Sequence, residues 1–173
     1  FPWMRKAVNT MLDFRRKKTS PVGVDISPEG LKLAQLRETS DGIYLHAAAR
    51  ETRPDGVEFG TGGWQKWAAG VLKRLSQRHG FAGRGVVAAM PSCDVFIEQV
   101  RVEEKTKDLK KAVHDKIASN LPFGIDEAAI NYVAAEPDAG GGQNVLVMAT
   151  EKKKVQRHLA IYENCGLEVK GLS

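Results

Sequence analysis

The fold is decided by the stretch Pro21–Arg37, which reads PVGVDISPEGLKLAQLR. Its beginning, Val22–Ile26, is a short and mainly apolar run of the length that a β-strand needs. Ser27–Gly30 has the composition of a tight turn, because proline presets φ and glycine allows positive φ. A second apolar strand follows over Leu31–Leu36. The stretch therefore predicts a β-hairpin.

Two charged residues occupy related places on this hairpin. Asp25 stands at the end of the first strand, and Lys32 comes just after the turn. An aspartate at a strand end can hold Mg²⁺ through water. A turn with exposed backbone N–H groups can bind phosphate, and a lysine can contact the phosphate oxygens. The alternative interpretation is a surface hairpin with a solvated lysine.

The composition is typical of one globular domain or two small ones. The chain has 173 residues, of which 42% are hydrophobic, and this is enough for a packed core. No apolar run approaches the roughly 20 residues that span a bilayer, and no signal peptide is recognisable. Two cysteines, Cys93 and Cys165, are too few for a disulfide framework, so we expect both to be reduced in a cytosolic protein. We interpret Cys93 as an ordinary buried thiol.

The excess positive charge is concentrated at the N-terminus. The net charge is +5, and residues 1–18 carry six basic side chains against one acid, so the remaining residues balance to zero. We therefore expect no nucleic-acid partner. The same segment predicts a basic amphipathic helix, because its apolar residues recur at helical spacing: Met4, Ala7, Val8, Met11 and Leu12.

Three roles are open to this predicted helix. It packs on the body of the protein, it docks onto a partner or another copy of the chain, or it lies on an anionic membrane. On such a membrane each basic residue near the surface contributes about 1 kcal/mol. We favour packing or docking, because the apolar face is short. Peripheral membrane contact through residues 1–18 is the alternative.

The hairpin is followed by a third strand, a helix and a returning strand. A turn at Ser40–Gly42 predicts a meander that continues into Ile43–Thr52. Val86–Met90 is wholly apolar, which predicts a strand buried on both faces. Between them we expect a helix that ends at Gly80. Its core face is formed by Trp64, Trp67, Ala68, Val71, Leu72 and Leu75.

A second set of elements begins at Val95–Val102, which predicts a strand. A helix follows with Leu109, Ala112, Val113, Ile117 and Leu121 on one face, and Pro122 ends it. Two strands over 129–135 and 145–150, joined by a glycine-rich hairpin loop, lead to a last helix over about 151–164. Its inward residues are Val155, Leu159 and Tyr162. The strand over 167–172 is expected to return to the first sheet.

No pattern in the sequence identifies catalytic residues, because no nucleophile stands beside a base in a recognisable motif. Lys152–Lys154 begins the last helix, where cations interact slightly unfavourably with the helix dipole. This placement suggests an acidic partner, and a solvated face is the favoured alternative.

Three motifs carry a resemblance to a known family. GVDISPEGLKL at 23–33 resembles the first phosphate loop of the actin-like ATPases, in particular that of the type IV pilus assembly proteins of the PilM family. VVAAMPSCDVFIEQVRV at 86–102 resembles a second passage of that family. LPFGIDEA at 121–128 is the most specific match, because a helix end, a turn and an acidic pair coincide in it.

The resemblance implies an α/β fold with mixed sheets, in two parts. An actin-like, ribonuclease H-like subdomain is expected over 19–92 plus 167–173. A small α+β subdomain of the kind that PilM shares with FtsA is expected to be inserted over 93–166. Residues 1–18 form the basic N-terminal segment.

The resemblance also implies a nucleotide site, for which ATP and Mg²⁺ are the expected ligands in the full-length protein. On this chain it assigns the nucleotide to Asp25, Ser27, Gly30 and Lys32, with Asp25 near the metal. Two residues depart from the family pattern: Pro28 lacks an N–H donor, and Glu29 puts a negative charge where phosphate would lie. The second phosphate loop of the family has no counterpart here. We therefore expect no tight nucleotide binding and no ATPase activity.

The partner implied by the resemblance is the N-terminal tail of a PilN-like membrane protein. The tail is expected in a groove between the two parts, at Val95, Phe96, Ile97, Leu121, Pro122 and Phe123. The competing interpretation of these residues is plain core. Pilus motor ATPases and further copies of the chain are other expected partners. The expected location is the cytoplasmic face of the inner membrane.

Two other functions compete with this scaffold role. One is the cytosolic domain of a type II secretion platform protein, which shares the fold. The other is an FtsA-like nucleotide-binding filament protein or half of a sugar kinase, which would require an intact second phosphate loop.

Overall fold

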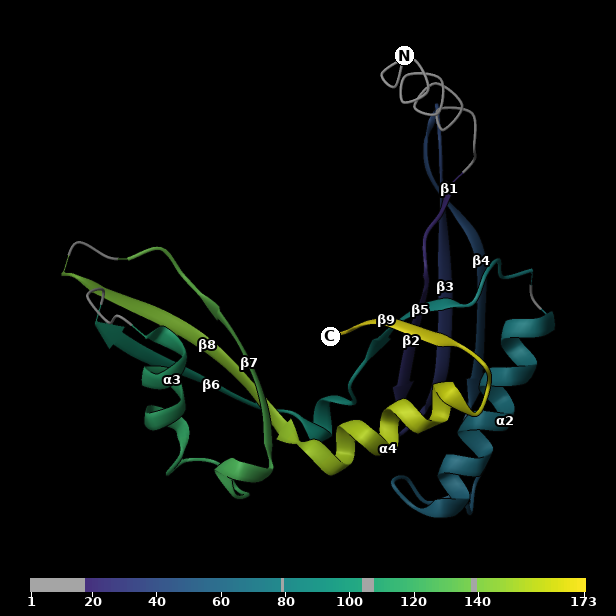
Figure 1. Cartoon of the computed structure of the whole chain (residues 1–173). Helices are drawn as coiled ribbons and strands as arrows, with labels where there is room; N and C mark the ends of the chain where they lie inside the picture. The colour runs from purple at the N-terminus through teal and green to yellow at the C-terminus, as the bar shows by residue number, and fades with distance from the viewer. Residues whose placement is uncertain (1–17, 79, 104–107, 138–139) are drawn as a thin grey trace, which may run out of the picture. The chain divides into compact units, whose positions relative to one another are not determined.

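The computed structural model describes residues 18–78, 80–103, 108–137 and 140–173 (Figure 1). The helix expected within residues 1–18 lies outside them, apart from Lys18. The chain divides into two compact units. The first unit comprises residues 1–89 and 164–173, and the second unit comprises residues 90–163. The insert proposed from the sequence, 93–166, begins and ends three residues later than the second unit.

The first unit contains a mixed sheet of six strands among its described residues. The predicted hairpin is confirmed, because β2 (Val22–Ser27) and β3 (Gly30–Thr39) pair antiparallel. The other edge of β3 pairs with β4 (Gly42–Thr52), which confirms the meander. The short β1 (Lys18–Thr19) also pairs with β3, beyond the beginning of β2. Parallel pairing continues the sheet from β2 to β5 (Gly85–Ala89) and then to β9 (Glu168–Leu172).

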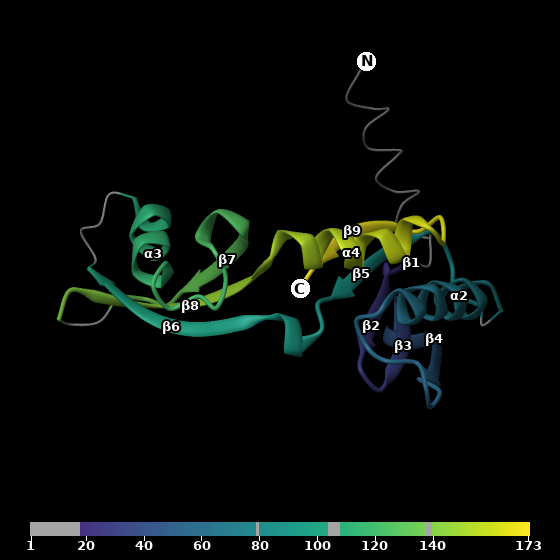
Figure 2. The same cartoon turned by 90° about the horizontal axis from the view of Figure 1, so that it is seen from below.

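One face of this sheet is covered by α2 (Gly62–Arg78), which lies against β3 and β4 (Figure 2). The helix buries residues at three- and four-residue spacing, so that one stripe faces the sheet: Trp64, Ala68, Val71, Leu72 and Leu75. Trp67 was expected in this core but is only half-buried, because it lies at the margin of the stripe. The sheet contributes alternate residues such as Leu31 and Leu33, which are nearly inaccessible to solvent.

The prediction that Val86–Met90 is buried on both faces was wrong. Val86 and Ala88 are buried, whereas Val87 between them is 39% exposed. Successive residues of a strand point to opposite faces, so β5 is buried on one face of the sheet. The other face of the sheet is open among the described residues.

The second unit has a sheet of three antiparallel strands in its described part. The central strand β8 (Gly142–Glu151) lies between the edge strands β6 (Phe96–Glu103) and β7 (Ala128–Ala134). The helix α3 (Leu109–Ile117) packs on one face. Between them lies an aliphatic core formed by Val100, Val102, Val113, Ile117, Val145 and Val147.

Both helices of this unit differ from their predicted form. The helix expected to continue to Leu121 ends at Ile117, and Leu121 instead packs on the core after a short turn. In α4 (Lys152–Glu163), Val155 and Leu159 are half-buried rather than core. The buried residues of α4 are His158, Ile161 and Tyr162. His158 is tolerated there because its ring nitrogen Nε2 lies 3.1 Å from the Tyr162 hydroxyl.

Candidate functional site

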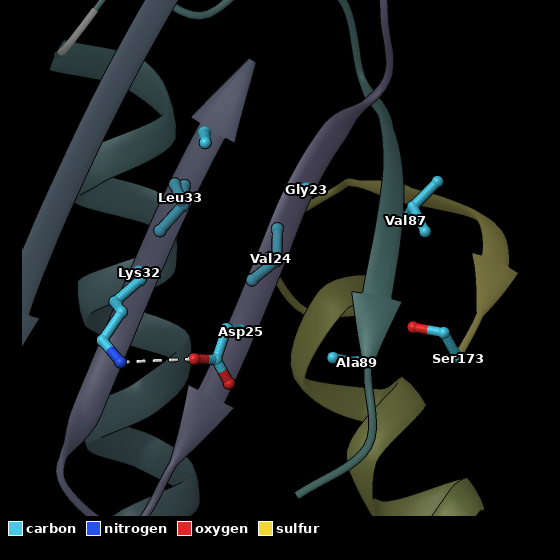
Figure 3. Close-up of a pocket in the computed structure, with 9 residues that line it drawn as sticks. Gly23, Val24, Asp25, Lys32, Leu33, Val87, Ala89 and Ser173 are labelled. Carbon is cyan, nitrogen blue, oxygen red and sulfur yellow. Dashed lines mark hydrogen bonds and ion pairs between the residues drawn. The ribbon is translucent and has the colours of Figure 1, made fainter. Parts of the chain in front are cut away.

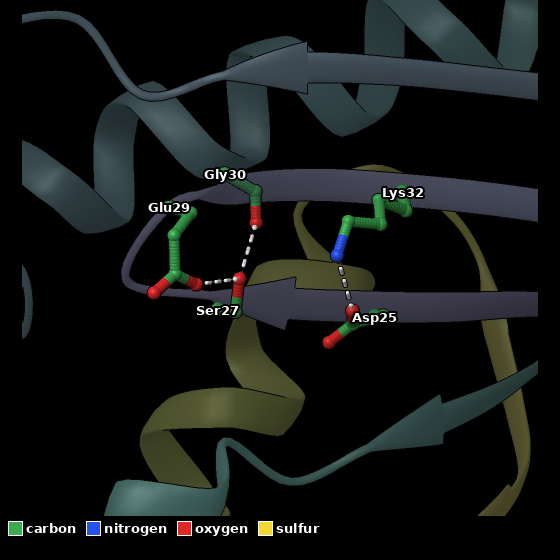
Figure 4. A network of polar contacts seen from close by, with 5 residues as sticks. All are labelled: Asp25, Ser27, Glu29, Gly30 and Lys32. Carbon is green, nitrogen blue, oxygen red and sulfur yellow. Dashed lines mark hydrogen bonds and ion pairs between the residues drawn. The ribbon is translucent and has the colours of Figure 1, made fainter.

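The β2–β3 turn holds its own carboxylate at the place where phosphate was expected. The hydroxyl of Ser27 donates a hydrogen bond of 2.8 Å to Glu29 (Figure 4). This bond, more than the nearby Lys32 and Arg53, lowers the pKa of Glu29, so its carboxylate is charged at neutral pH. Arg53 stabilises the turn, because its Nε donates a hydrogen bond to the carbonyl oxygen of Pro28. A phosphate would meet a fixed negative charge here.

Gly30 is required by sheet packing. Its φ is +151°, and a Cβ atom there would overlap the carbonyl oxygen of Glu51 and lie 3.0 Å from the Cα atom of Thr52. Both neighbours are backbone atoms of the paired strand β4. The glycine therefore lets β3 and β4 approach each other at the turn.

Asp25 and Lys32 lie directly opposite each other on β2 and β3. The Lys32 ammonium is 3.5 Å from the Asp25 carboxylate, and the two side chains are 65% and 48% exposed (Figure 3). Both line an open hollow of about 360 Å³ together with Gly23, Val24, Leu33, Ala34, Val87, Ala89 and Ser173. Ser27 and Gly30 lie outside this lining. The described residues contain no group of three or more acidic, histidine or cysteine side chains that could hold a metal.

These residues do not form a phosphate cradle as they stand. Pro28 has no N–H group to offer, the Ser27 hydroxyl is bonded to Glu29, and Lys32 and Asp25 face each other. The turn thus supplies a negative charge where a nucleotide would need donors. The assignment of Asp25, Ser27, Gly30 and Lys32 to ATP and Mg²⁺ stays a prediction from the resemblance.

The second unit contains a groove of about 390 Å³ where several elements meet. Four residues predicted to bind a partner line it, namely Val95, Phe96, Pro122 and Phe123. Cys93 lines it too, which corrects the prediction of a buried thiol. It is exposed because it lies on the short 3₁₀ turn η1 (Ser92–Asp94), which has no buried residue.

The two remaining predicted residues lie elsewhere. Ile97 follows Phe96 on β6, so its side chain points to the opposite face of the sheet, where it is 59% exposed. Leu121 packs against the aliphatic core of the unit. The structure therefore separates the six candidates into four groove residues, one surface residue and one core residue.

The turn that follows α3 is hydrogen-bonded to the beginning of β6. The amide of Asn120 donates a hydrogen bond of 2.7 Å to Glu98, which is on the same face of β6 as Phe96. The backbone N–H of Leu121 donates to the carbonyl of Ile117. These contacts hold the turn next to β6, and Pro122, Phe123 and Phe96 line the same groove.

The polar wall of the groove is an ion-pair cluster that sequence reasoning missed. Lys154 lies 2.8 Å from Asp94 and 3.5 Å from Glu151. The hydrogen bond with Asp94 raises the pKa of Lys154 against the opposing effect of burial. A hydrogen bond from Lys153 is the main cause that lowers the pKa of Glu151. The acidic partners suggested by Lys152–Lys154 thus include residues of the chain itself.

No helix in the described part of the chain is long and apolar enough to cross a membrane. A comparison with curated proteins gives no match. Among solved structures, the chain is similar to one described as the PilM–PilN type IV pilus biogenesis complex. The TM-score is 0.76 and the sequence identity 23%, over 88% of this chain and 46% of that one. The chain thus spans about half the length of that relative, and this likeness shows the fold.

A second similar structure is a protein with an actin-like ATPase fold and unknown function from Bacteroides thetaiotaomicron. Its TM-score is 0.44 at 10% identity, over 93% of this chain and 54% of that one. The family model of the type IV pilus assembly protein PilM matches residues 23–172. This match includes the hairpin, the groove and the returning strand β9. The chain therefore belongs to the family of the type IV pilus assembly protein PilM.

Proposed function

We propose that the chain acts as a scaffold in type IV pilus assembly and binds the cytosolic N-terminal tail of a PilN-like membrane protein. Family membership and the likeness to a PilM–PilN complex support this function. The observation that carries it is the groove of the second unit, where apolar residues from separate elements converge on one half-open space.

The apolar wall of the groove suits side chains of an extended peptide. Phe96 and Phe123 are half-buried, and Pro122 is exposed between α3 and β7. Aromatic side chains of this kind contribute much of the binding energy when a partner excludes water from them. We assign the apolar anchors of the tail to this wall.

The backbone of β6 offers a second means of binding. In the described part of the sheet, β6 is an edge strand that pairs only with β8. An edge strand presents backbone donors and acceptors to an added strand. A tail that anchors its apolar residues beside Phe96 can continue along this edge.

The polar wall offers paired charges to the tail. Asp94 and Glu151 place two carboxylates at the groove, and Lys154 and Lys153 supply two ammonium groups that pair with them. Polar groups of the tail would therefore meet ion pairs that are already formed, which favours specificity over added affinity.

This function places the chain at the cytoplasmic face of the inner membrane, where a membrane protein's cytosolic tail is accessible. Motor ATPases and further copies of the chain are additional proposed partners. We propose no enzymatic role for residues 1–173, since the Ser27 hydroxyl on the β2–β3 turn is engaged by the charged Glu29 carboxylate.

The proposal is tested with a fluorescent synthetic peptide of the cytosolic tail of PilN from the same organism. We expect Phe96→Ala and Phe123→Ala each to raise the Kd of the peptide about tenfold or more, because each variant removes an aromatic side chain that the bound tail would bury. Ile97→Ala is the matched control, because Ile97 is equally apolar and adjacent but lies outside the groove. Its affinity should stay within about twofold of the original.

Thermal unfolding of each variant verifies that the second unit stays folded. If Ile97→Ala lost affinity and Phe96→Ala did not, the tail would bind on the other face of the sheet and not in the groove. Absence of binding to the unmodified chain would reject the proposed function.

A further inference from the structure

The strand β4 is an edge of the six-stranded sheet, because in the described part of the chain it pairs with β3 alone (Figure 2). Three successive apolar side chains near its beginning are strongly exposed. Ile43 is 69% exposed, Tyr44 51% and Leu45 64%. Successive residues of a strand point to opposite faces, so apolar surface is exposed on both faces of this edge. A strand added at the edge would cover both faces at once.

The edge of β4 lacks the charges that usually protect an open edge. Edge strands commonly carry lysine, proline or other charged residues, which discourage pairing with another chain. The strand at the opposite edge, β9, follows this pattern with the exposed Glu168 and Lys170. In β4, no residue from Gly42 to Ala49 is an acid, a lysine, an arginine or a proline. The backbone of β4 is therefore available to another strand.

Two exposed residues of opposite charge stand at the ends of this uncharged stretch. Asp41 precedes it and Arg50 follows it, and neither forms an ion pair with a described residue. Arg50 pairs across the sheet with Lys32, which places two cations side by side. Nine positions of extended strand separate Asp41 from Arg50 by roughly 30 Å, so they cannot pair within one chain. An antiparallel second copy of β4 brings the two charges together.

A β-bulge decides which residues of β4 share a face. Gln35 pairs with Ala47 and Leu36 pairs with Leu45, which leaves His46 as the extra residue of β4. In a strand without a bulge, two residues share a face only when an even number of positions separates them. Across the bulge at His46, residues separated by an odd number of positions share a face.

This shift makes the register that matches the charges consistent in both faces. When Asp41 lies opposite Arg50 of a second copy, each bulky apolar residue lies opposite a small one: Ile43 opposite Ala48, and Tyr44 opposite Ala47. The registers with β3 place the two members of each pair on the same face. A large side chain beside a small one packs without overlap, and two-fold symmetry repeats every contact.

We propose that two copies of the chain pair antiparallel through their β4 strands, about a two-fold axis between Leu45 and His46. The contact joins the two sheets edge to edge, and an ion pair between Asp41 and Arg50 forms at each end. It gives the further copies of the chain a defined binding surface. The groove of the second unit takes no part in this contact, so the dimer and the binding of the tail are tested separately.

Disulfide trapping in the full chain tests the register. Cys93→Ser and Cys165→Ala first remove the two native thiols. A chain with Ile43→Cys is then mixed with an equal amount of a chain with Ala48→Cys, oxidised mildly and analysed on a non-reducing gel. We expect a covalent dimer, because paired residues of antiparallel strands lie within the distance of about 7 Å between Cα atoms that a disulfide needs.

Each of these two chains oxidised alone is the matched control. In the proposed register, two copies of Ile43 lie five positions apart along the strand pair, a distance of roughly 17 Å, and so do two copies of Ala48. Each chain alone should therefore give at least about tenfold less covalent dimer than the mixture in the same time. Equal yields from the mixture and from the single chains, or no dimer in any of them, would overturn the proposal.

Sedimentation equilibrium of chains without new thiols tests the ion pairs. Arg50→Glu should raise the Kd of the dimer about tenfold or more, because it places two carboxylates opposite each other at both ends of the strand pair. Lys110→Glu is the matched control, since it changes the net charge equally and lies exposed on α3. Its Kd should stay within about twofold of that of the original chain.

A charge swap completes the test. Asp41→Arg combined with Arg50→Glu restores opposite charges at both ends, so the Kd should return to within about threefold of the original value. Thermal unfolding verifies that the first unit is intact in each variant. An original chain that is monomeric at about 0.1 mM, or a double variant that binds no more tightly than Arg50→Glu, would overturn the proposal.

Discussion

The ammonium of Lys154 lies 2.8 Å from the carboxylate of Asp94 and joins the first turn of α4 to η1 at the polar wall of the groove. The two side chains are 33% and 24% exposed. At such partial burial an ion pair is screened less than at the open surface. Lys153 contacts Glu151 as well, but its side chain is 65% exposed.

We predict that Lys154→Gln lowers the free energy of unfolding by about 1 kcal/mol, because it leaves Asp94 without this cation. Lys153→Gln is the matched control and should cost less than about 0.5 kcal/mol, since surface pairs contribute little. Urea unfolding at neutral pH measures both changes. Equal costs for the two variants would show that the contact with Asp94 has no special weight.

The stabilisation by Lys154 should depend on pH in a defined way. The folded pKa of Lys154 is raised, first by its hydrogen bond with Asp94, so its contribution is present below the usual value of 10.5 and is lost as the pH rises through the raised pKa. The folded pKa of Glu151 is lowered mainly by Lys153, so most of that contribution remains in Lys154→Gln. The difference in stability between the original chain and Lys154→Gln should therefore shrink as the pH rises above the usual pKa of lysine. Unfolding measured at neutral and at alkaline pH checks the prediction, and a difference that grows in alkali would contradict it.

Gly30→Ala should be strongly destabilising, by about 3 kcal/mol or more, because the new methyl group meets the backbone of β4. Gly42→Ala is the control, since its φ is +135° but no atom lies within 4 Å of the added Cβ. It should cost only about 1 kcal/mol of backbone strain. Thermal unfolding of both variants separates two costs. Gly42→Ala measures the strain of a positive φ, and the additional loss in Gly30→Ala measures the steric clash with the backbone of β4.

Gln35 ties three segments of the first unit together and is 1% exposed. Its amide nitrogen donates to the carbonyl oxygens of Ser20 and Ala82, and its amide oxygen accepts from the N–H of Ala82. Gln35→Leu leaves these backbone groups unpaired and should cost about 3 kcal/mol. Gln99→Leu on the exposed side of β6 should change stability by less than about 0.5 kcal/mol. If Gln35→Leu changed the free energy of unfolding only slightly, water would be forming the hydrogen bonds to Ser20 and Ala82 in place of the Gln35 amide.

Calorimetric titration of the chain with MgATP should show a Kd weaker than about 1 mM. The reason is the charged Glu29 on the β2–β3 turn, together with Ser27 being engaged by it. The same titration with Glu29→Ser shows how much of the weak affinity for MgATP is due to the negative charge of Glu29. A micromolar Kd for the unmodified chain would contradict the prediction.

The hairpin could be predicted from the sequence because its determinants are local. Proline and glycine favour a turn wherever they occur, and apolar residues on either side then pair as strands. The meander and α2 were correctly predicted for the same reason. The last strand returns to the first sheet as expected, and the structure adds that its partner there is β5. Sequence reasoning failed where burial depends on the neighbours of an element, as with Val87 and the ends of α3.

The sequence by itself determined the order of strands and helices and the family, and it named four of the residues that line the groove together with two that do not. Only the tertiary structure decided which of these residues share a surface. Phe96 and Ile97 are neighbours in sequence, but the pleat of β6 sends one into the groove and the other away from it. Asp94, Glu151 and Lys154 come from η1, β8 and α4, and no local pattern connects them. The physical reason is that periodicity fixes the direction of a side chain only relative to its own element, whereas a site depends on how separate elements pack.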